Sequence, residues 1–305
     1  MNYKKVIKSR KIRLKILRFF NFLPDKMMLK IQYFIKHNRK LNLSPPKRFT
    51  EKIQYYKLYY RNKNMPNCVD KYNVRKYIKT KGLEDILIPL YGLYDNVNDI
   101  DFFDLPNQFV MKTTNGGGGI NIIICKNKRE LNINYVKETM KNWLQPKKVS
   151  GSREWVYSNL KPRIVVEEYL ENHKQPEAGI IDYKFFCFNG VPEYVVVDID
   201  RYTSHKRNFY DSNWNYINVS SDTPNFGDKM KKPEGLDEML EVASILSNDF
   251  PFVRVDLYYV NKKIYFGEMT FFPWSGYVEF IPDRFDFILG SNFEIDSIKN
   301  IGDKK

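Results

Sequence analysis

Three pairs of short apolar segments, each joined by a turn signal, constrain the fold of this chain more than any other feature. Such pairs predict β-hairpins, because Asn and Gly readily adopt the backbone angles that tight turns require. The three pairs are residues 108–112 with 120–125 around a glycine run, residues 182–200 around Asn189-Gly190, and residues 252–260 with 263–272 around Asn261-Lys262. Antiparallel hairpins mixed with helices predict an α+β fold instead of a doubly wound parallel sheet.

Helical periodicity and further apolar runs complete the predicted order of elements. A helix is expected to begin near Phe49, where Thr50 can act as the N-cap. The other predicted elements are helices over residues 69–81, 136–144 and 236–246, a strand within IPLYGLYDN and a strand over 163–170.

Charge is distributed unevenly along the chain. Residues 1–63 carry 19 lysines and arginines and only two acids, whereas the rest carries 31 basic and 34 acidic residues. The pair Leu105-Pro106 is a candidate boundary. We therefore expect a basic, mainly helical region over residues 1–105 and a second domain over residues 106–305.

The first residues predict a basic, imperfectly amphipathic helix over 4–23. This segment, within residues 1–63, has two equal interpretations. One is peripheral contact with an anionic membrane, and the other is a helix packed on the body with a solvated basic face. We expect no nucleic-acid partner, because no recognition motif accompanies the charge. No run approaches the ~20 apolar residues that a membrane span requires.

The cysteines and histidines are few and scattered. The three cysteines lack CxxC spacing, which favours reduced thiols and a cytoplasmic location, at most peripheral at the inner face of the membrane. The three histidines lie at no zinc-like spacing. A zinc site is therefore not expected.

The first hairpin carries residues suited to holding phosphate groups. Lys112 ends its first strand, and Asn115 is followed by Gly116, Gly117, Gly118 and Gly119. A run of glycines lets backbone amides approach an oxyanion without interference from Cβ atoms. The lysine precedes the glycines and no Gly-Lys-Ser/Thr follows, so this is not a Walker loop. A flexible turn is the plainer interpretation.

The last hairpin carries two acids in apolar surroundings. Asp256 and Glu268 are expected to lie roughly opposite each other on one face, where they suit hard cations with oxygen ligands. The alternative is an acid neutralised by the neighbouring Arg254. Near the middle of the chain, Glu167 and Glu168 end a predicted strand, whose free backbone groups and acids suit a nucleoside.

In this order, the segments FVMK, a glycine-rich hairpin, VVEEYL, RVDLYYV and FGEMTFFPWSG resemble the ATP-grasp fold. More narrowly, the chain is similar over roughly residues 41–290 to the TupA-like ATP-grasp family, named for teichuronopeptide biosynthesis and met in bacterial surface-polysaccharide gene clusters. The upstream segments LNLSPPKRFTEKIQYYKL and DKYNVRKYI take part in this likeness. The resemblance implies two α+β subdomains that clamp ATP.

The resemblance also implies roles for individual residues. Lys112 contacts the α and β phosphates, residues 116–119 close over the triphosphate, and Lys184 and Arg254 steady the transferring group. Asp256 and Glu268 bind Mg²⁺, with Thr270 where many members carry an Asn ligand. The residues implied in adenine and ribose binding are Glu167, Glu168, Leu170 and Glu171.

The implied reaction is ATP- and Mg²⁺-dependent ligation of a carboxylate to an amine through an acyl phosphate. The expected substrates are an acidic glycan or peptide of a bacterial surface polysaccharide or capsule, and an amino acid or other amine. Candidates for the acceptor pocket, each equally explained as part of a solvated hairpin end, are Asp198, Asp200, Arg201, Arg207 and Asn208.

A rival interpretation uses some of the same acids. Asp198-Ile199-Asp200 is an Asp-x-Asp tripeptide like those of metal-dependent glycosyltransferases of surface-polysaccharide synthesis. A membrane-associated scaffold without activity is a further alternative. It leaves the pattern of Lys112, Asp256 and Glu268 unexplained.

Overall fold

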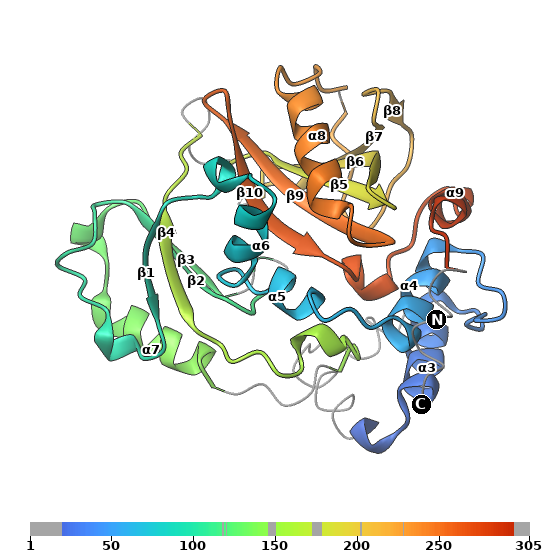
Figure 1. Cartoon of the computed structure of the whole chain (residues 1–305), viewed down its shortest axis with the longest axis horizontal. Helices are drawn as coiled ribbons and strands as arrows, with labels where there is room; N and C mark the ends of the chain where they lie inside the picture. The colour runs from blue at the N-terminus through green and yellow to red at the C-terminus, as the bar shows by residue number, and fades with distance from the viewer. Residues whose placement is uncertain are drawn as a thin grey trace.

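Two antiparallel sheets form the framework of the protein (Figure 1). Sheet A has four strands in the order β1-β4-β2-β3, and sheet B has six in the order β10-β9-β5-β6-β7-β8. With the helices around them, the sheets confirm the predicted α+β class. This computed structural model describes residues 20–117, 119, 121–145, 151–172, 179–201, 203–227 and 229–295. The helix predicted over 4–23 lies largely outside these residues.

Sheet A contains the glycine-rich hairpin. Its strands are β1 (Leu90–Tyr94), β2 (Phe109–Thr113), β3 (Ile122–Cys125) and β4 (Ile164–Glu168). The hairpin is confirmed, because β2 pairs with β3 and places Lys112 opposite Ile122. Helix α7 (Ile133–Trp143) fulfils the helix prediction over 136–144, and it buries Val136 and Met140 against this sheet.

Sheet A crosses the expected division at Leu105-Pro106. Strand β1 precedes that point yet pairs with β4, and Phe102 and Leu105 belong to the same buried cluster as Phe109. A cut between residues 105 and 106 would therefore divide one sheet and its core.

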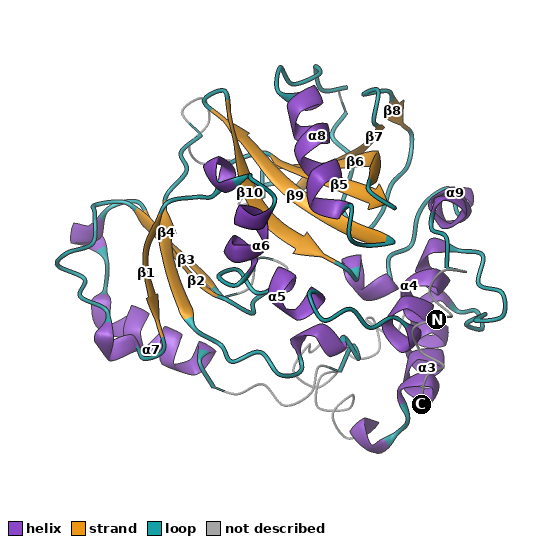
Figure 2. Ribbon diagram, viewed as in Figure 1, coloured by secondary structure: helices purple, strands orange, loops and turns teal. Residues whose placement is uncertain are grey.

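Sheet B contains the other two predicted hairpins. Its strands are β5 (Asp182–Phe188), β6 (Val191–Ile199), β7 (Lys206–Asp211), β8 (Tyr216–Ile217), β9 (Phe252–Val260) and β10 (Lys263–Thr270). Positive φ angles at Asn189 and Gly190, and at Asn261 and Lys262, give both turns the geometry that closes a two-residue hairpin. Figure 2 shows helix α8 (Leu236–Ser247) lying over this sheet.

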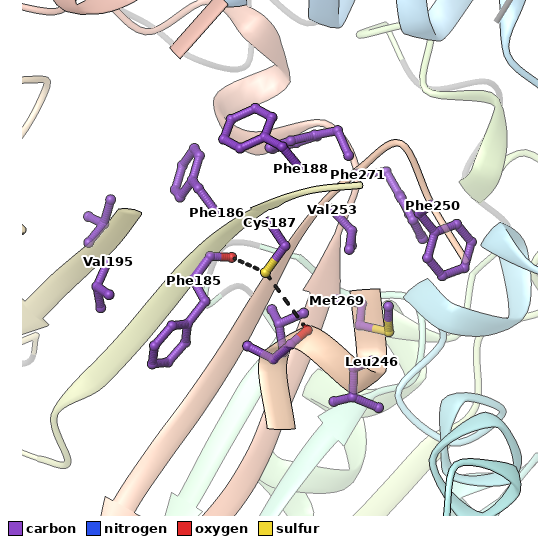
Figure 3. Close-up of a cluster of buried hydrophobic side chains, with 14 of the residues drawn as sticks. Phe185, Phe186, Cys187, Phe188, Val195, Leu246, Phe250, Val253, Met269 and Phe271 are labelled. Atoms are coloured by element: carbon purple, nitrogen blue, oxygen red, sulfur yellow. Dashed lines mark hydrogen bonds between the residues drawn. The ribbon is translucent and has the colours of Figure 1, made fainter. Parts of the chain in front are cut away.

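The main hydrophobic core lies on sheet B. Figure 3 shows side chains of β5 packed with residues of α8, β9 and β10, among them Leu246, Val253 and Met269. Every residue of β5 is buried. The three cysteines are free and buried, and Cys187 lies within this core.

The N-terminal helices pack against sheet B. They are α3 (Asp25–His37), α4 (Phe49–Tyr59), α5 (Met65–Val69) and α6 (Val74–Thr80). Phe49 of α4 packs its ring against Phe186 and Phe252, with centroids 5.9 and 5.1 Å apart. The single helix predicted over 69–81 is instead divided, because α5 ends at Val69 and α6 begins at Val74. Figure 1 shows α5 and α6 between the two sheets.

The predicted Thr50 cap is wrong. Helix α4 already includes Thr50, whose hydroxyl donates to Asp286 of α9 (Arg284–Asn292) at 2.7 Å. The Glu51 carboxylate instead accepts from the amides of Lys47 and Arg48 at 2.9 and 3.1 Å. Short 3₁₀ turns complete the chain, namely Phe20–Phe22, Glu84–Ile86, Val97–Asp99, Lys128–Glu130, Trp155–Tyr157 and Pro273–Gly276. No described helix is long and apolar enough to cross a membrane.

Candidate functional site

Two carboxylates face each other across the β9–β10 hairpin. Asp256 and Glu268 are direct cross-strand partners, as expected, but the turn alone does not produce this pairing. Regular pairing from the two-residue turn would set Asp256 opposite Gly267. A bulge between Phe266 and Glu268 shifts the register by one residue, so that both acids share a face.

Two cations neutralise these acids in the ligand-free protein. Arg254 donates to both oxygens of Asp256 at 2.6 and 2.7 Å, and its Nη2 also reaches Glu268 Oε1 at 3.1 Å. Lys184 Nζ donates to Asp256 Oδ2 at 2.8 Å. The hydroxyl of Thr270 lies 3.2 Å from Arg254 Nη2 and 3.3 Å from Glu268 Oε1. Arg254 therefore neutralises Asp256, as the sequence-based alternative expected. The candidate metal ligands Asp256, Glu268 and Thr270 nevertheless lie close together.

A third carboxylate, absent from the sequence-based candidates, completes this cluster. Asp182 Oδ2 accepts from Lys184 Nζ and, at 2.6 Å, from Arg201 Nη1. Asp182 is 1 % exposed, and its Oδ1 has no hydrogen-bond partner. The signal was available, because Asp182 and Lys184 stand two apart on one strand and so share a face.

Sheet A contributes a separate charge cluster. Lys112 Nζ lies 2.7 Å from Glu167 Oε2, and Arg75 lies 3.5 Å from the other oxygen of that carboxylate. The Glu168 amide already donates to the carbonyl of Pro89 at 3.0 Å, so it is not open to a nucleoside base. Leu170 and Glu171 follow the strand in partly exposed positions.

Lys71 connects the two sheets, and sequence reasoning did not select it. Its Nζ donates to the carbonyl of Gly116 in the glycine run and lies 4.0 Å from Glu268 Oε2. Burial lowers the pKa of Lys71, an effect that the carboxylate of Glu268 opposes. The only sequence hint was its place in DKYNVRKYI, one of the family-like segments.

The glycine run also lies against Arg201. A Cβ atom added at Gly119 would lie 3.4 Å from Arg201 Nη2, whereas one at Gly117 would meet nothing within 4 Å. Gly119 has a φ of 72°, a region that residues with a side chain rarely adopt. Gly118 lies outside the described residues. The loop of sheet A is therefore next to the charged cluster of sheet B.

These cations control the ionisation of Glu268. Burial alone would raise the pKa of Glu268, but the nearby charges of Lys71, Arg254 and Lys184 lower it to about 2. The carboxylate is thus charged at neutral pH and able to bind a cation.

The five acceptor candidates lie in different surroundings, and Lys184 Nζ lies 3.9 Å from Asp198 Oδ2. Arg207 donates to both oxygens of Asp198 at 2.6 and 3.1 Å, and both residues are buried. Asn208 is fully buried, and Asp200 lies in the turn that follows β6 with a φ of 54°. Arg201 belongs with Asp182 beside the glycine run.

In the Asp-x-Asp tripeptide, Asp198 is buried, whereas Asp200 is partly exposed. Burial would raise the pKa of Asp198, but hydrogen bonding to Arg207 and the charge of Lys184 hold it below its usual value. With Arg207 bound to both its oxygens, Asp198 is already neutralised.

The donor set fits a magnesium ion that takes part of its oxygen ligands from outside the protein. Among the described residues, no group of three or more His, Cys, Asp or Glu side chains is arranged to hold a metal ion alone. Magnesium in phosphate-transfer sites commonly takes one or two protein carboxylates and fills its octahedron with phosphate oxygens and water. Asp256 and Glu268 supply two carboxylates. Asp182 Oδ1, which has no hydrogen-bond partner, is a further oxygen acceptor nearby.

The chain matches the model of a known protein family. The model of the family described as "TupA-like ATPgrasp" matches residues 51–294, which include both sheets and every candidate residue named above. Among curated proteins, none matches the chain significantly.

Several solved structures of ligases are similar to the chain at low identity. A D-alanine–D-alanine ligase from Helicobacter pylori is 15 % identical with a TM-score of 0.46, covering 80 % of this chain and 68 % of that one. The Bacillus anthracis enzyme complexed with ATP is 17 % identical with a TM-score of 0.41, covering 67 % and 54 %. Phosphoribosylamine–glycine ligase from Thermotoga maritima is 12 % identical with a TM-score of 0.39, covering 70 % and 49 %. The chain thus spans about half the length of the last two.

Proposed function

Because this chain belongs to the TupA-like ATP-grasp family, we propose that it joins a carboxylate to an amine with ATP and Mg²⁺ through an acyl phosphate. The observation that carries the proposal is the meeting of two clusters at the glycine run. Lys71 contacts that run and lies near Glu268, so phosphate-binding groups of sheet A adjoin the acids of sheet B.

Each cluster has a distinct task in this proposal. Lys112 and Lys71 hold the phosphates, and the glycine run closes over them. Glu167 lies at the nucleoside end. Asp256 and Glu268, aided by Thr270, hold Mg²⁺, which supplies charge neutralisation for the β and γ phosphates when it is bound. Asp182 is proposed to keep Lys184 and Arg201 aligned beside the run.

The reaction then follows from the charges. An oxygen of the substrate carboxylate attacks the γ-phosphorus, the bond to the β-phosphate oxygen breaks, and ADP leaves. Lys184 and Arg254 stabilise the charge that develops on the transferring group. The amine then attacks the acyl carbon, phosphate leaves with the bonding electron pair, and the amine loses a proton. Closure of the glycine run excludes water from the acyl phosphate.

The proposed substrates follow the family and the charge of the site. We take the carboxylate to belong to an acidic sugar or peptide of a bacterial surface polysaccharide or its precursor, and the amine to be an amino acid or related compound. Arg201, beside the glycine run, is the best-placed of the acceptor candidates to meet such an anion. The three free, buried thiols agree with a reaction in the cytoplasm.

A melting experiment tests the nucleotide part of the proposal. ATP with Mg²⁺ is expected to raise the melting temperature, because a ligand that binds only the folded chain stabilises it. A rise with a nucleotide sugar and none with MgATP would contradict the ligase and favour the glycosyltransferase.

A screen for ADP release then tests the substrates. Uronic acids, amino acids and their nucleotide-linked forms are offered in pairs of one carboxylate and one amine. The proposal predicts ADP release that needs both partners. Release with a carboxylate alone in the presence of hydroxylamine would reveal the acyl phosphate as a hydroxamate.

A further inference from the structure

Helix α3 has two apolar faces, although a helix on a protein surface needs only one. Its inner face buries Met28, Leu29 and Tyr33. The opposite face carries four large apolar side chains at i, i+4, i+7 and i+8, the spacing of a single helical face. They are Met27, Ile31, Phe34 and Ile35, which are 51 %, 39 %, 53 % and 43 % exposed. We call these four residues the outer face of α3.

Lysines border this outer face. Lys26 and Lys30 are exposed one turn apart along its edge. An open hollow of about 360 Å³ runs beside Ile31, Phe34 and Ile35, and its lining includes Lys30 and Lys40.

The nearby acids do not offset these lysines. Asp25, the one acid of α3, is held by Arg153 at 2.9 Å. Glu51, the other acid among residues 20–63, is buried and accepts from backbone amides. Among the basic residues of the same stretch, Arg39 and Arg48 pair with Asp283, but Lys26, Lys30 and Lys40 are exposed. These three lysines give the border of the outer face a positive charge.

We propose that the outer face of α3 docks on the surface of an anionic lipid bilayer. Ile31, Phe34 and their neighbours enter the boundary between headgroups and acyl chains, and Lys26, Lys30 and Lys40 pair with lipid phosphates. The inner face stays anchored to the body, so α3 lies in the membrane plane. The bilayer thus places the enzyme beside membrane-borne substrates.

Charge favours the lipid bilayer over two other occupants of the outer face, a second copy of the chain and residues 1–19. A second copy docked face to face would bring two rows of lysines together, and like charges across an interface are unfavourable. Residues 1–19 carry eight basic residues and no acid, so their charge also opposes docking on this face. A nucleic acid would satisfy the lysines but not the aliphatic side chains between them.

Sedimentation of the full chain with vesicles tests the proposal. Vesicles of phosphatidylcholine with phosphatidylglycerol are expected to bind the protein, and phosphatidylcholine alone is not. Added salt should weaken binding, since exposed charges are screened. The double variant Ile31→Asp/Phe34→Asp should bind at least roughly tenfold more weakly. Its matched control is Phe103→Asp, because Phe103 is 88 % exposed beside sheet A, and its binding should be unchanged.

Charge-reversal variants separate attraction to anionic lipid from nonspecific binding. Each lysine near an anionic surface strengthens binding about fivefold, so Lys26→Glu/Lys30→Glu should weaken it by more than about 25-fold. Lys141→Glu, an exposed position on α7, is the control for net charge. ADP release with soluble substrates should be unchanged in all these variants.

A site-directed probe reports the depth of docking. The native cysteines are buried, so Phe34→Cys can be labelled selectively with an environment-sensitive dye. The proposal predicts a blue shift on adding anionic vesicles, and none for a label at Phe103→Cys. It is overturned if anionic vesicles fail to sediment the chain, if Phe103→Asp weakens binding as much as the α3 variant, or if light scattering shows that the outer face holds a dimer together.

Discussion

Sheets A and B hold the two halves of the candidate site in different ways. In sheet B the acids and cations rise from long strands packed on a large aromatic core, with α4, α8 and α9 around it. Sheet A has a much smaller core, and Lys112 stands on a strand that ends in glycines. Sheet B therefore anchors its charged side chains in the larger core, and in the proposed function it holds the groups beside the reacting phosphate, whereas sheet A holds the nucleotide. Variants in B should therefore change turnover, and variants in A should change nucleotide affinity.

The largest effect is expected from the sheet B acids. Asp256→Asn and Glu268→Gln should each lower ADP release by about a thousandfold, because in the proposed mechanism each removes a charge that holds magnesium against the phosphates. The two variants should differ in their free energy of unfolding. Asp256→Asn leaves Arg254 and Lys184 short of a buried counter-charge and should cost about 3 kcal/mol in denaturant unfolding, whereas the 30 % exposed Glu268 should cost less.

Asp237→Asn is the control for this pair, since its side chain is 82 % exposed on α8. Normal turnover in both Asp256→Asn and Glu268→Gln would remove them from the metal site and end the distinction between the two sheets.

The next effect concerns the sheet A cation. Lys112→Met should weaken MgATP binding about tenfold or more, because it removes the proposed charge-assisted contact with phosphate. Turnover at saturating ATP should fall much less than in the sheet B variants. Lys141→Met, a change at an exposed position on α7, should leave MgATP binding normal. Equal losses of affinity and turnover in Lys112→Met would contradict a division of labour between the sheets.

A smaller effect is expected from the glycine run. Gly119→Ala forces a side chain into a left-handed backbone conformation at a cost of about 1 kcal/mol and brings its Cβ into contact with Arg201, so loop closure and turnover should fall roughly fivefold. Gly117→Ala, which meets nothing within 4 Å, should change turnover less. Stopped-flow measurement of ADP release compares them. The reverse order would show that the loop does not close against Arg201.

The smallest effect on turnover is expected at His37, the buried last residue of helix α3. Burial lowers the pKa of His37 to about 4, below its ordinary 6.5. The unfolded chain therefore binds this proton more readily, so stability is complete above pH 6.5 and falls by up to roughly 3 kcal/mol as the pH drops to 4. His37→Phe should flatten that fall in denaturant titrations while leaving turnover at neutral pH unchanged. An identical pH dependence in the variant would contradict this assignment.

Local signals in the sequence predicted the hairpins and the fold class. Asn189-Gly190 and Asn261-Lys262 close their turns with the backbone angles that Asn and Gly favour, which is local chemistry. Asp256 and Glu268 were correctly paired, but the bulge that pairs them was not predicted. A Cβ at Gly267 would come within 3.0 Å of the Asp256 carbonyl, so the glycine there reflects a close approach that only the paired strands reveal.

The contacts that join the two sheets were beyond sequence reasoning. Lys71 lies 45 residues from Gly116 and 197 from Glu268 along the chain, and only the packing of α5 and α6 between the sheets brings them together. Thr50 failed as a cap for the same reason, because its partner Asp286 lies on a distant helix.

Binding calorimetry of ATP, with and without Mg²⁺, tests the central claim that both sheets hold one nucleotide. The account predicts one site per chain with Mg²⁺-enhanced affinity in the wild type. Lys112→Met should weaken binding and keep the enhancement, whereas Glu268→Gln should lose it. ATP that fails to bind, or Mg²⁺ enhancement that survives in Glu268→Gln, would contradict the account.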